Sequence, residues 1–304
     1  MMKSILSSIA ALLLGAAALS AQEKISPPAL ASLVEAERSF AKVSAAKGIR
    51  ESFIMFFADD GINFQPHPTV TKAAFLKQPA PTERPPITLN WAPIFADVAA
   101  AGDLGFTTGP FQLADDRSKQ AVRVGFYFSL WKKQSDGNWR VVVDAGVQTP
   151  TPGVALDVPF KPAERARAAK PAPMASLEAG RASLLEADRL LLDSAKHLGL
   201  ARAFTDVATE DSRIHRQGRF PIIGKEAIRS YFSEKPYAVL WEPVRADVSS
   251  SGDLGYTYGK YELKDDLSQT ESAEKGYYVR VWVRTGESKW RLALDTHSPV
   301  PAGQ

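Results

Sequence analysis

The sequence contains no cysteine. This absence excludes disulfides, thiolate nucleophiles and cysteine-ligated metals, so the fold must be stabilised by burial of its core. The four histidines are scattered, and neither H-E-x-x-H nor a close cluster of histidine and carboxylate residues occurs. The motif G-x-S-x-G, which carries the serine of α/β-hydrolases, is also missing. We therefore expect no metal site and no cofactor.

A strong excess of positive charge is lacking as well. Lys and Arg number 37 against 34 Asp and Glu, which gives a net charge of +3. Nucleic-acid-binding domains present a strongly basic face, so nucleic acid is not an expected partner. The segment "GRFPIIGKE" (218–226) is not a phosphate-binding loop, because five residues separate its glycines and Glu226 replaces the Ser or Thr that binds magnesium.

Long apolar runs are missing except near the first residue. Lys3 precedes an apolar stretch from Ile5 to Leu19, and "ALSA" (18–21) supplies small residues before Gln22. This pattern predicts a secretory signal peptide over residues 1–21, too short to span a membrane and cleaved after Ala21. No cysteine follows that could carry a lipid. We expect an exported protein, periplasmic or extracellular, with no membrane anchor after cleavage.

The most informative feature that is present is a repeat. "AGDLGFTTGPFQL" (101–113) returns as "SGDLGYTYGKYEL" (251–263), and seven of the thirteen positions are identical. Other segments match at the same offset, such as "NWRVVVDAG" (138–146) with "KWRLALDTH" (289–297). The offset of 150 or 151 residues predicts two tandem copies of one domain.

The copies have predictable boundaries. We expect copy one over residues 28–152, copy two over 175–302, and a proline-rich linker over 153–174. The linker residues Val154 to Phe160 alternate between apolar and other types, so an arm lying across one domain is the alternative.

Each copy is expected to be α+β, because helical patterns come first and strands follow. In copy two, Leu184 and Leu191 belong to a helical apolar stripe, and further helices are expected from about Arg202 to Thr209 and after Gly224. The strands are expected at 244–249, 255–263, 276–284 and 289–296.

Two segments of copy two resemble a known superfamily. "ATEDSRIHRQGRFPIIGKEAIRSYF" (208–232) resembles SnoaL-like proteins, and "GYYVRVWVRTGESKWRLALDTHSP" (276–299) resembles the terminal hairpin of nuclear transport factor 2-like domains. Within this superfamily the sequence is most similar to the bacterial domain of unknown function 4440. The resemblance implies a cone-shaped, cystatin-like fold in which a bent antiparallel sheet wraps around helices and encloses a pocket. Copy one departs from the pattern, because "PHPTVTKAAFL" (66–76) lacks the glycine before the helix.

The terminal hairpin of copy two carries the candidate binding site. Side chains alternate along a strand, so the odd-numbered residues from Tyr277 to Val283 should share an apolar face with Trp290, Leu292 and Leu294. The opposite face should carry the candidate ligand-binding residues Tyr278, Arg280, Trp282, Asp295 and His297.

These residue types fit a small carboxylate-bearing or aromatic ligand, because arginine binds carboxylates in a bidentate manner. In the kinase association domains that the hairpin also resembles, the positions of Arg280 and His297 line the pocket. The alternative is a structural ion pair between Arg280 and Asp295 on a sheet face covered by the other domain. Copy one has Ser129 and Gly146 at the positions of Arg280 and His297, so we expect the site in copy two and a scaffold role for copy one.

Catalysis is left open. Weak catalytic candidates are Asp211, His215, Asp295 and His297, of which Asp211 and His215 lie on or beside a strand that faces the pocket mouth in SnoaL-like relatives. The alternative, which we favour for His215, is a strand on the surface of the protein. Three functions remain: a small-molecule binder, an acid/base enzyme of the isomerase, dehydratase or hydrolase type, and a structural pseudo-dimer with filled pockets. We also expect the two copies to pair within one chain, because a linker gives each copy its partner at high effective concentration.

Overall fold

The computed structural model describes residues 28–64, 66–83, 85–118, 120–164, 174–234, 238–265, 272–284 and 289–303. The predicted signal peptide lies outside these residues. Among the described residues, no helix has the length and apolar character needed to cross a membrane. No group of three or more His, Cys, Asp or Glu side chains in this part of the chain is placed to hold a metal ion.

The first half of the chain begins with helices and continues into strands. The third helix of this half forms although no glycine precedes it. Val70 takes its N-cap position with an ordinary φ of −67°. The elements are α1 (Pro28–Lys47), α2 (Ile49–Phe56), β1 (Phe57–Phe64), β2 (Pro68–Val70), α3 (Thr71–Lys77), β3 (Ile87–Trp91), β4 (Phe95–Val98), β5 (Leu104–Asp115), β6 (Ala121–Lys133) and β7 (Trp139–Gln148).

The second half has the same order of elements after the short strand β8 (Lys161–Pro162). Its long strand β11 takes the place of β3 and β4, which are separate strands in the first half. The elements are α4 (Leu177–Leu198), α5 (Leu200–Val207), β9 (Ala208–His215), β10 (Ile222–Ile223), α6 (Lys225–Ser233), β11 (Ala238–Val248), β12 (Leu254–Lys264), β13 (Glu274–Arg284) and β14 (Trp290–Pro299).

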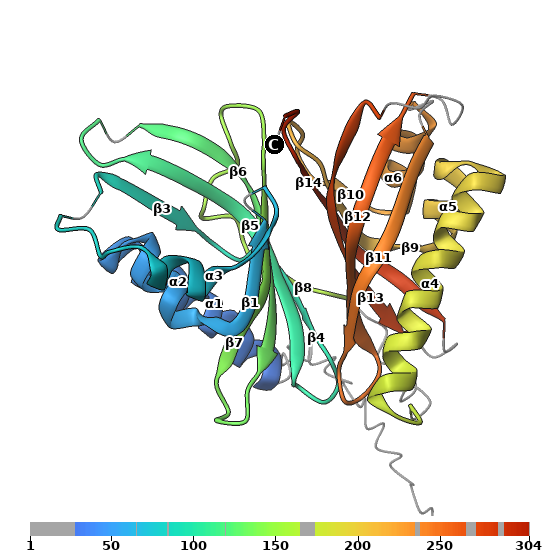
Figure 1. Cartoon of the computed structure of the whole chain (residues 1–304), viewed down its shortest axis with the longest axis horizontal. Coiled ribbons are helices and arrows are strands. Elements are labelled where there is room, and N and C mark those ends of the chain that lie inside the picture. Colours follow the sequence, from blue (N-terminus) through green and yellow to red (C-terminus); the bar gives the residue numbers. More distant parts are fainter. Residues whose placement is uncertain are drawn as a thin grey trace, which may run out of the picture.

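Each half has one sheet of its own. The strand orders are β2-β1-β7-β6-β5-β4-β8, with β3 also on β5, and β10-β9-β14-β13-β12-β11. All pairings are antiparallel except β1 with β7, β9 with β14 and β4 with β8, which are parallel. In Figure 1 the two sheets face each other and the helices lie on the outer sides. The predicted α+β class is therefore confirmed, with helices against a bent, mainly antiparallel sheet in each half.

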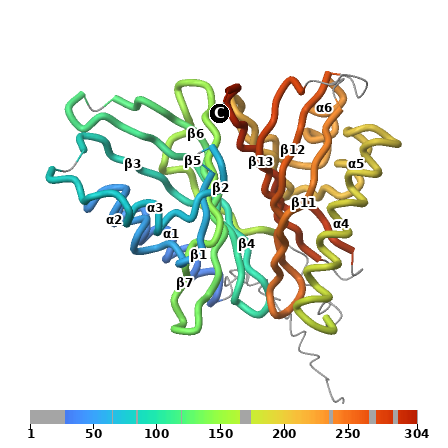
Figure 2. Tube along the Cα trace, viewed as in Figure 1, coloured from blue at the N-terminus to red at the C-terminus, as the bar shows by residue number. Residues whose placement is uncertain are grey.

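The facing sheets share a hydrophobic core. One apolar cluster contains residues of both halves, including Phe106 and Phe128 from the first and Val279 and Val281 from the second. The ring of Phe95 also contacts the guanidinium of Arg213 across the same boundary, at 3.3 Å from the ring centroid. Figure 2 shows the same arrangement along the chain trace, with the first-half sheet beside the second-half sheet.

The repeated "GDLG" turn has a local role and a role between the halves. Gly102 and Gly252 have φ of 69° and 68°, a left-handed conformation that favours glycine. The backbone N–H of Ser250 donates to Asp103, at 2.9 Å, and the N–H of Ala100 donates to Asp253, at 3.1–3.2 Å. The turn of each half is thus held by the aspartate of the other, which explains why both copies keep the acid.

The described part of the linker behaves as an arm. Lys161 and Pro162 pair with Phe95 and Ala96 of β4, and Phe160 packs against the core of the first half. The backbone N–H of Glu164 then donates to a carboxylate of the second half. Residues 160–164 therefore follow the alternative interpretation of the linker, an arm lying across one domain. Residues 165–173 lie outside the described part.

Candidate functional site

The terminal hairpin of the second half is regularly paired at one end and has a bulge at the other. Arg280 faces Asp295, which is the pair of the structural alternative, and Tyr278 faces His297. The register then shifts between Val281 and Trp282, so Trp282 faces Leu292. The bulge turns Trp290 and Leu292 towards the helix-facing core with Trp282, and Ala293 joins the core between the halves. The prediction that Trp290 and Leu292 share the face of Val281 is therefore wrong.

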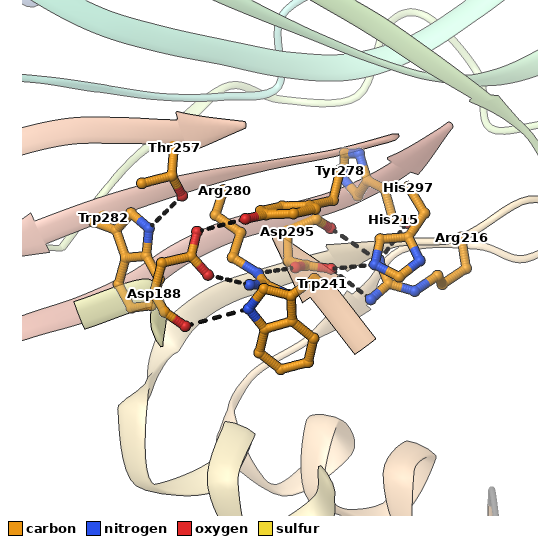
Figure 3. A network of polar contacts seen from close by, with 10 residues as sticks. All are labelled: Asp188, His215, Arg216, Trp241, Thr257, Tyr278, Arg280, Trp282, Asp295 and His297. Atoms are coloured by element: carbon orange, nitrogen blue, oxygen red, sulfur yellow. Dashed lines mark hydrogen bonds and ion pairs between the residues drawn. The ribbon is translucent and has the colours of Figure 1, made fainter. Parts of the chain in front are cut away.

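Arg280 lies at the centre of a buried polar network (Figure 3). Its Nε donates to Asp295 at 2.7 Å, and its Nη1 donates to Asp188 of α4. Asp295 also pairs with Arg216, and the hydroxyl of Tyr278 donates to Asp188 at 2.9 Å. Arg280 is 1% exposed and both aspartates are fully buried. We call these five residues the second-half network.

Aromatic rings enclose the guanidinium of Arg280. Its central carbon lies 4.1 Å from the ring centroid of Trp241, 4.3 Å from that of Tyr278 and 5.6 Å from that of Phe204. Figure 3 shows the arginine between the rings of Tyr278 and Trp241. Such contacts stabilise a desolvated cation. The structural ion pair between Arg280 and Asp295 is thus present, but the helices of its own half cover it rather than the other domain.

Little free space remains in the second half. The cavity beside Arg280 and His297 measures about 10 Å³, which is close to the space that one water molecule needs. The structure thus brings Tyr278, Arg280, Asp295 and His297 together as predicted, but their polar atoms and rings contact one another. The expected ligand site in the second half therefore has little free space among the described residues.

The charges of this network compensate each other. Burial alone would raise the pKa of Asp295, but Arg216 and Arg280 hold it well below its usual value. Burial works against the charge of Arg280, yet the two aspartates raise its pKa. Burial, Arg216 and Arg280 lower the pKa of His297, whose ring stacks on Tyr261 at 4.0 Å between centroids. His297 is therefore a neutral ring.

The other two catalytic candidates do not reach this cavity. Asp211 accepts the backbone N–H of Glu164 at 2.7 Å and so fastens the arm. His215 is 1% exposed, and its ring contacts Phe126 of the first half, 5.9 Å between centroids. Burial, with Arg213 and Arg216, lowers the pKa of His215 to about 3. The interpretation of His215 as a surface residue is wrong, because the first half covers it.

The larger cavity lies in the first half and has a volume of about 160 Å³. We call it the first-half cavity. Ser129 and Gly146 stand where the second half has Arg280 and His297, and both of these smaller residues line the space. The other lining residues are mostly aromatic or apolar: Phe40, Phe53, Leu89, Trp91, Phe111, Tyr127, Asp144 and Ala145.

One end of the first-half cavity is polar. Ser129 donates to Asp144 at 2.8 Å. The hydroxyl of Tyr127 is buried beside Thr107, but no described residue meets the distance and angle of a hydrogen bond to it. Burial raises the pKa of Asp144 to about 8, the hydrogen bond from Ser129 opposes this rise, and the charge of Glu37 adds to it. A carboxyl that exchanges its proton near neutral pH and an unpartnered hydroxyl therefore face one space.

Glu37 of α1 lies behind this polar end and stands at the position of Asp188. It accepts hydrogen bonds from Trp91, Thr107 and Trp131, the last at 2.8 Å. In the second half, the residue equivalent to Trp131 donates instead to a threonine. The longer glutamate side chain takes these donors, which is why the hydroxyl of Tyr127 has no carboxylate partner.

Glu37, Asp188 and Arg216 were not among the site residues predicted from the sequence. A signal for the first two was present, because position 188 lies on the apolar helical stripe between Leu184 and Leu191. All three residues of that stripe are buried. An acid on a buried helical face needs a partner, and Arg280 was available on the facing strand. No comparable signal marked Arg216.

No family model and no curated protein matches the sequence. Solved structures resemble part of it. A nuclear transport factor 2-like protein with a cystatin-like fold from Novosphingobium aromaticivorans is 18% identical, with 40% of this chain and 82% of that chain covered and a TM-score of 0.35. A ketosteroid isomerase-like protein from Erwinia carotovora is 15% identical, covering 38% and 93%, with a TM-score of 0.33. A calcium/calmodulin-dependent protein kinase type II association domain, described as putative, from Thiobacillus denitrificans is 17% identical, covering 38% and 94%, with a TM-score of 0.32.

Proposed function

We propose that this protein is an exported small-molecule binder built from two tandem SnoaL-like domains, related to the bacterial domain of unknown function 4440, with its ligand site in the first half. The observation that carries the proposal is the first-half cavity. Its aromatic walls and convergent polar groups, Tyr127, Ser129 and Asp144, are the combination typical of ligand pockets. A cavity of about 150 Å³ in another protein binds benzene, so the space suits a molecule of about one ring.

The second half is the weaker candidate for the ligand site. A ligand there would have to displace the partners that Arg280 already has, namely Asp188 and Asp295. Truncating such a buried pair exposes an uncompensated charge, so the arginine is costly to free. A wholly structural pseudo-dimer would need filled interiors in both halves, and the first-half cavity argues against it.

The experiment is a ligand-detected NMR screen of ring-sized molecules against the mature chain. Hits should lose binding in Ser129→Arg, which places a long side chain in the cavity. Ser230→Arg is the matched control, because it adds the same side chain on an exposed helical position. Gly146→His, which narrows the same cavity without adding an arginine, is the second blocking variant. Hits that bind both blocking variants as well as the wild type would place the site elsewhere.

General acid–base catalysis is the second candidate function, and Asp144 favours it. The pKa of this carboxyl is raised to about 8, mainly by burial, and general acid–base catalysis works best when the pKa lies near the working pH. The test is hydrogen–deuterium exchange at the α-carbon of small cyclic ketones in D₂O, followed by NMR. Exchange by the mature chain that Asp144→Asn removes and Asp136→Asn keeps would support an enzyme. Equal rates with and without protein would leave binding as the function.

A further inference from the structure

The two halves enclose similar sets of side chains, but among the described residues a buried cation lies between them in the second half and not in the first. In the second half, two carboxylates and three aromatic rings hold the guanidinium of Arg280. The first half keeps residues of the same kind at each of these five positions. The residues Asp188, Asp295, Phe204, Trp241 and Tyr278 correspond to Glu37, Asp144, Phe53, Trp91 and Tyr127.

The strand register defines which first-half residue is equivalent to Arg280. Ser129 faces Asp144 across β6 and β7, as Arg280 faces Asp295 across β13 and β14. Both hairpins also have a register shift one residue later, so the two ladders coincide at this point. Ser129 is too short to occupy the space of an arginine side chain. The first-half cavity lies beside Ser129 and Asp144.

A second, independent observation concerns the hydroxyl of Tyr127. In the second half the equivalent hydroxyl of Tyr278 donates to Asp188 at 2.9 Å. Tyr127 is 7% exposed and lines the cavity, and its hydroxyl has no hydrogen-bond partner in the described part of the chain. Burying a hydroxyl without a partner costs free energy, and a ligand with an N–H donor would remove that cost.

We propose that the first-half cavity binds a small organic cation, an amidinium, guanidinium or ammonium group on a body of about one ring, with the charged group at Asp144, Ser129 and Tyr127. This inference rests on the proposed small-molecule site. The apolar body lies against the aromatic walls, and Trp91 supplies a cation–π contact like that of Trp241 with Arg280. The external cation thereby takes the place that Arg280 has in the second half.

Binding of a cation is linked to a proton. Burial raises the pKa of Asp144 to about 8, which favours the protonated carboxyl at pH 7. The titratable groups that face this carboxyl are Glu37 from α1 and Tyr127 from β6, while β1 brings Asn63 and α2 brings Phe53. A cation favours the ionised carboxylate, so its binding releases a proton. Affinity for a cation therefore rises with pH up to about 8.

The test compares three molecules of nearly equal shape: benzamidinium, neutral benzamide and anionic benzoate. Isothermal titration calorimetry with the mature chain at pH 6.5 and 8.5 gives the affinities. We expect benzamidinium to bind at least tenfold more tightly than benzamide at pH 8.5, and benzoate to bind most weakly. The affinity for benzamidinium should fall at pH 6.5, and the affinity for benzamide should not. Asp144→Asn should abolish the preference for the cation, whereas the exposed control Asp136→Asn should keep it.

Each failure has its own meaning. Equal affinity for benzamidinium and benzamide would overturn the cation while leaving a small-molecule site in the first half. Benzamidinium that binds the blocking variants Ser129→Arg and Gly146→His as well as it binds the Ser230→Arg control would overturn the location. A failure of all three probes to bind the wild type, together with an empty NMR screen, would overturn the proposed function and the cation with it.

Discussion

The two halves of this chain have the same order of elements and similar hairpin registers, but their interiors differ. In the second half, Arg280 fills the space between strand and helix and pairs with acids on both sides. In the first half, Ser129 stands at that position and a cavity of about 160 Å³ remains. The comparison teaches that an arginine or a serine at one strand position distinguishes a salt-bridged interior from one with a cavity, while most surrounding positions keep aromatic or carboxylate side chains in both halves.

The difference between Arg280 and Ser129 also reverses the direction in which the pKa of the neighbouring aspartate is shifted. Arg216 and Arg280 hold the pKa of Asp295 well below its usual value against the effect of burial. Asp144 has no such cation among the described residues around it, and burial raises its pKa to about 8. Asp295 therefore contributes stability that is present above the pKa of the unfolded chain and is lost in acid, whereas Asp144 behaves in the opposite way.

The largest expected effect follows from Arg280→Ser, which gives the second half the residue of the first. Asp188 and Asp295 would lose their shared partner while remaining buried, and breaking a buried pair in this way costs about 3–5 kcal/mol. Urea unfolding of the mature chain measures the loss. Arg229→Ser, which removes an exposed pair with Glu226, is the control and should change stability by less than about 1 kcal/mol. A stable Arg280→Ser protein that has lost a ligand would restore the prediction of a binding site in the second half.

A smaller effect is expected from removing one hydroxyl in each half. Tyr278→Phe deletes the hydrogen bond to the buried Asp188, and hydrogen bonds to charged groups contribute about 1.5–3 kcal/mol. Tyr127→Phe deletes a hydroxyl without a partner, so its stability should stay within about 0.5 kcal/mol or rise. Both changes keep the ring, and the difference in unfolding free energy isolates the hydrogen bond. Equal losses in the two variants would mean that Tyr127 has a partner in solution.

The pH dependence of stability separates the halves further. Between about pH 4 and pH 8, folded Asp144 holds a proton that the unfolded chain has lost, so raising the pH destabilises the fold. The slope from one such group is at most about 1.4 kcal/mol per pH unit. Urea unfolding from pH 5 to 8 should therefore show a steeper loss for the wild type than for Asp144→Asn. Parallel curves would show that Asp144 is ionised in the folded protein at pH 5.

The fold could be predicted from sequence because its signals are local and occur twice. The apolar stripes, the "GDLG" turn and the alternating strands each predict an element, and agreement between the copies supported most of these assignments. The bulge at Ala293 was beyond this reasoning, since strict alternation assumes that every residue is paired. One unpaired residue moved Trp290 and Leu292 to the other face.

The site was harder to predict because the space around Arg280 is filled by residues that are distant in the sequence. Three residues of the second-half network, Tyr278, Arg280 and Asp295, were identified on the strands, and Arg280 was correctly paired with Asp295. The helix that supplies Asp188 was identified too. Its contact with the hairpin was not predicted, because Asp188 and Arg280 are 92 residues apart in the sequence. Because that contact was not predicted, Arg280 was interpreted as a residue available to bind the carboxylate of a ligand. The smaller residues of the first half therefore suggested a scaffold, although they leave the larger cavity.

A small change in stability is expected from Gly146→His, which introduces the second-half residue at the edge of the first-half cavity. A Cβ at Gly146 would meet Phe111 at 3.5 Å, an ordinary contact, and the glycine has no positive φ. The new imidazole can stack on Phe111 as His297 stacks on Tyr261, so stability should change by less than about 1 kcal/mol.

Ligand binding should respond far more than stability to this change. The imidazole would occupy part of the space now lined by Gly146 and Phe111, and ring-sized probes should bind at least tenfold more weakly. Gly137→His is the matched control, because this exposed turn glycine has open space around its Cβ, although its φ of 80° adds some strain of its own. Calorimetry with benzamidinium and benzamide measures both proteins. If Gly146→His binds the probes as the wild type does, the space between Gly146 and Phe111 is not part of the ligand site, and the difference in binding between the halves depends on Ser129.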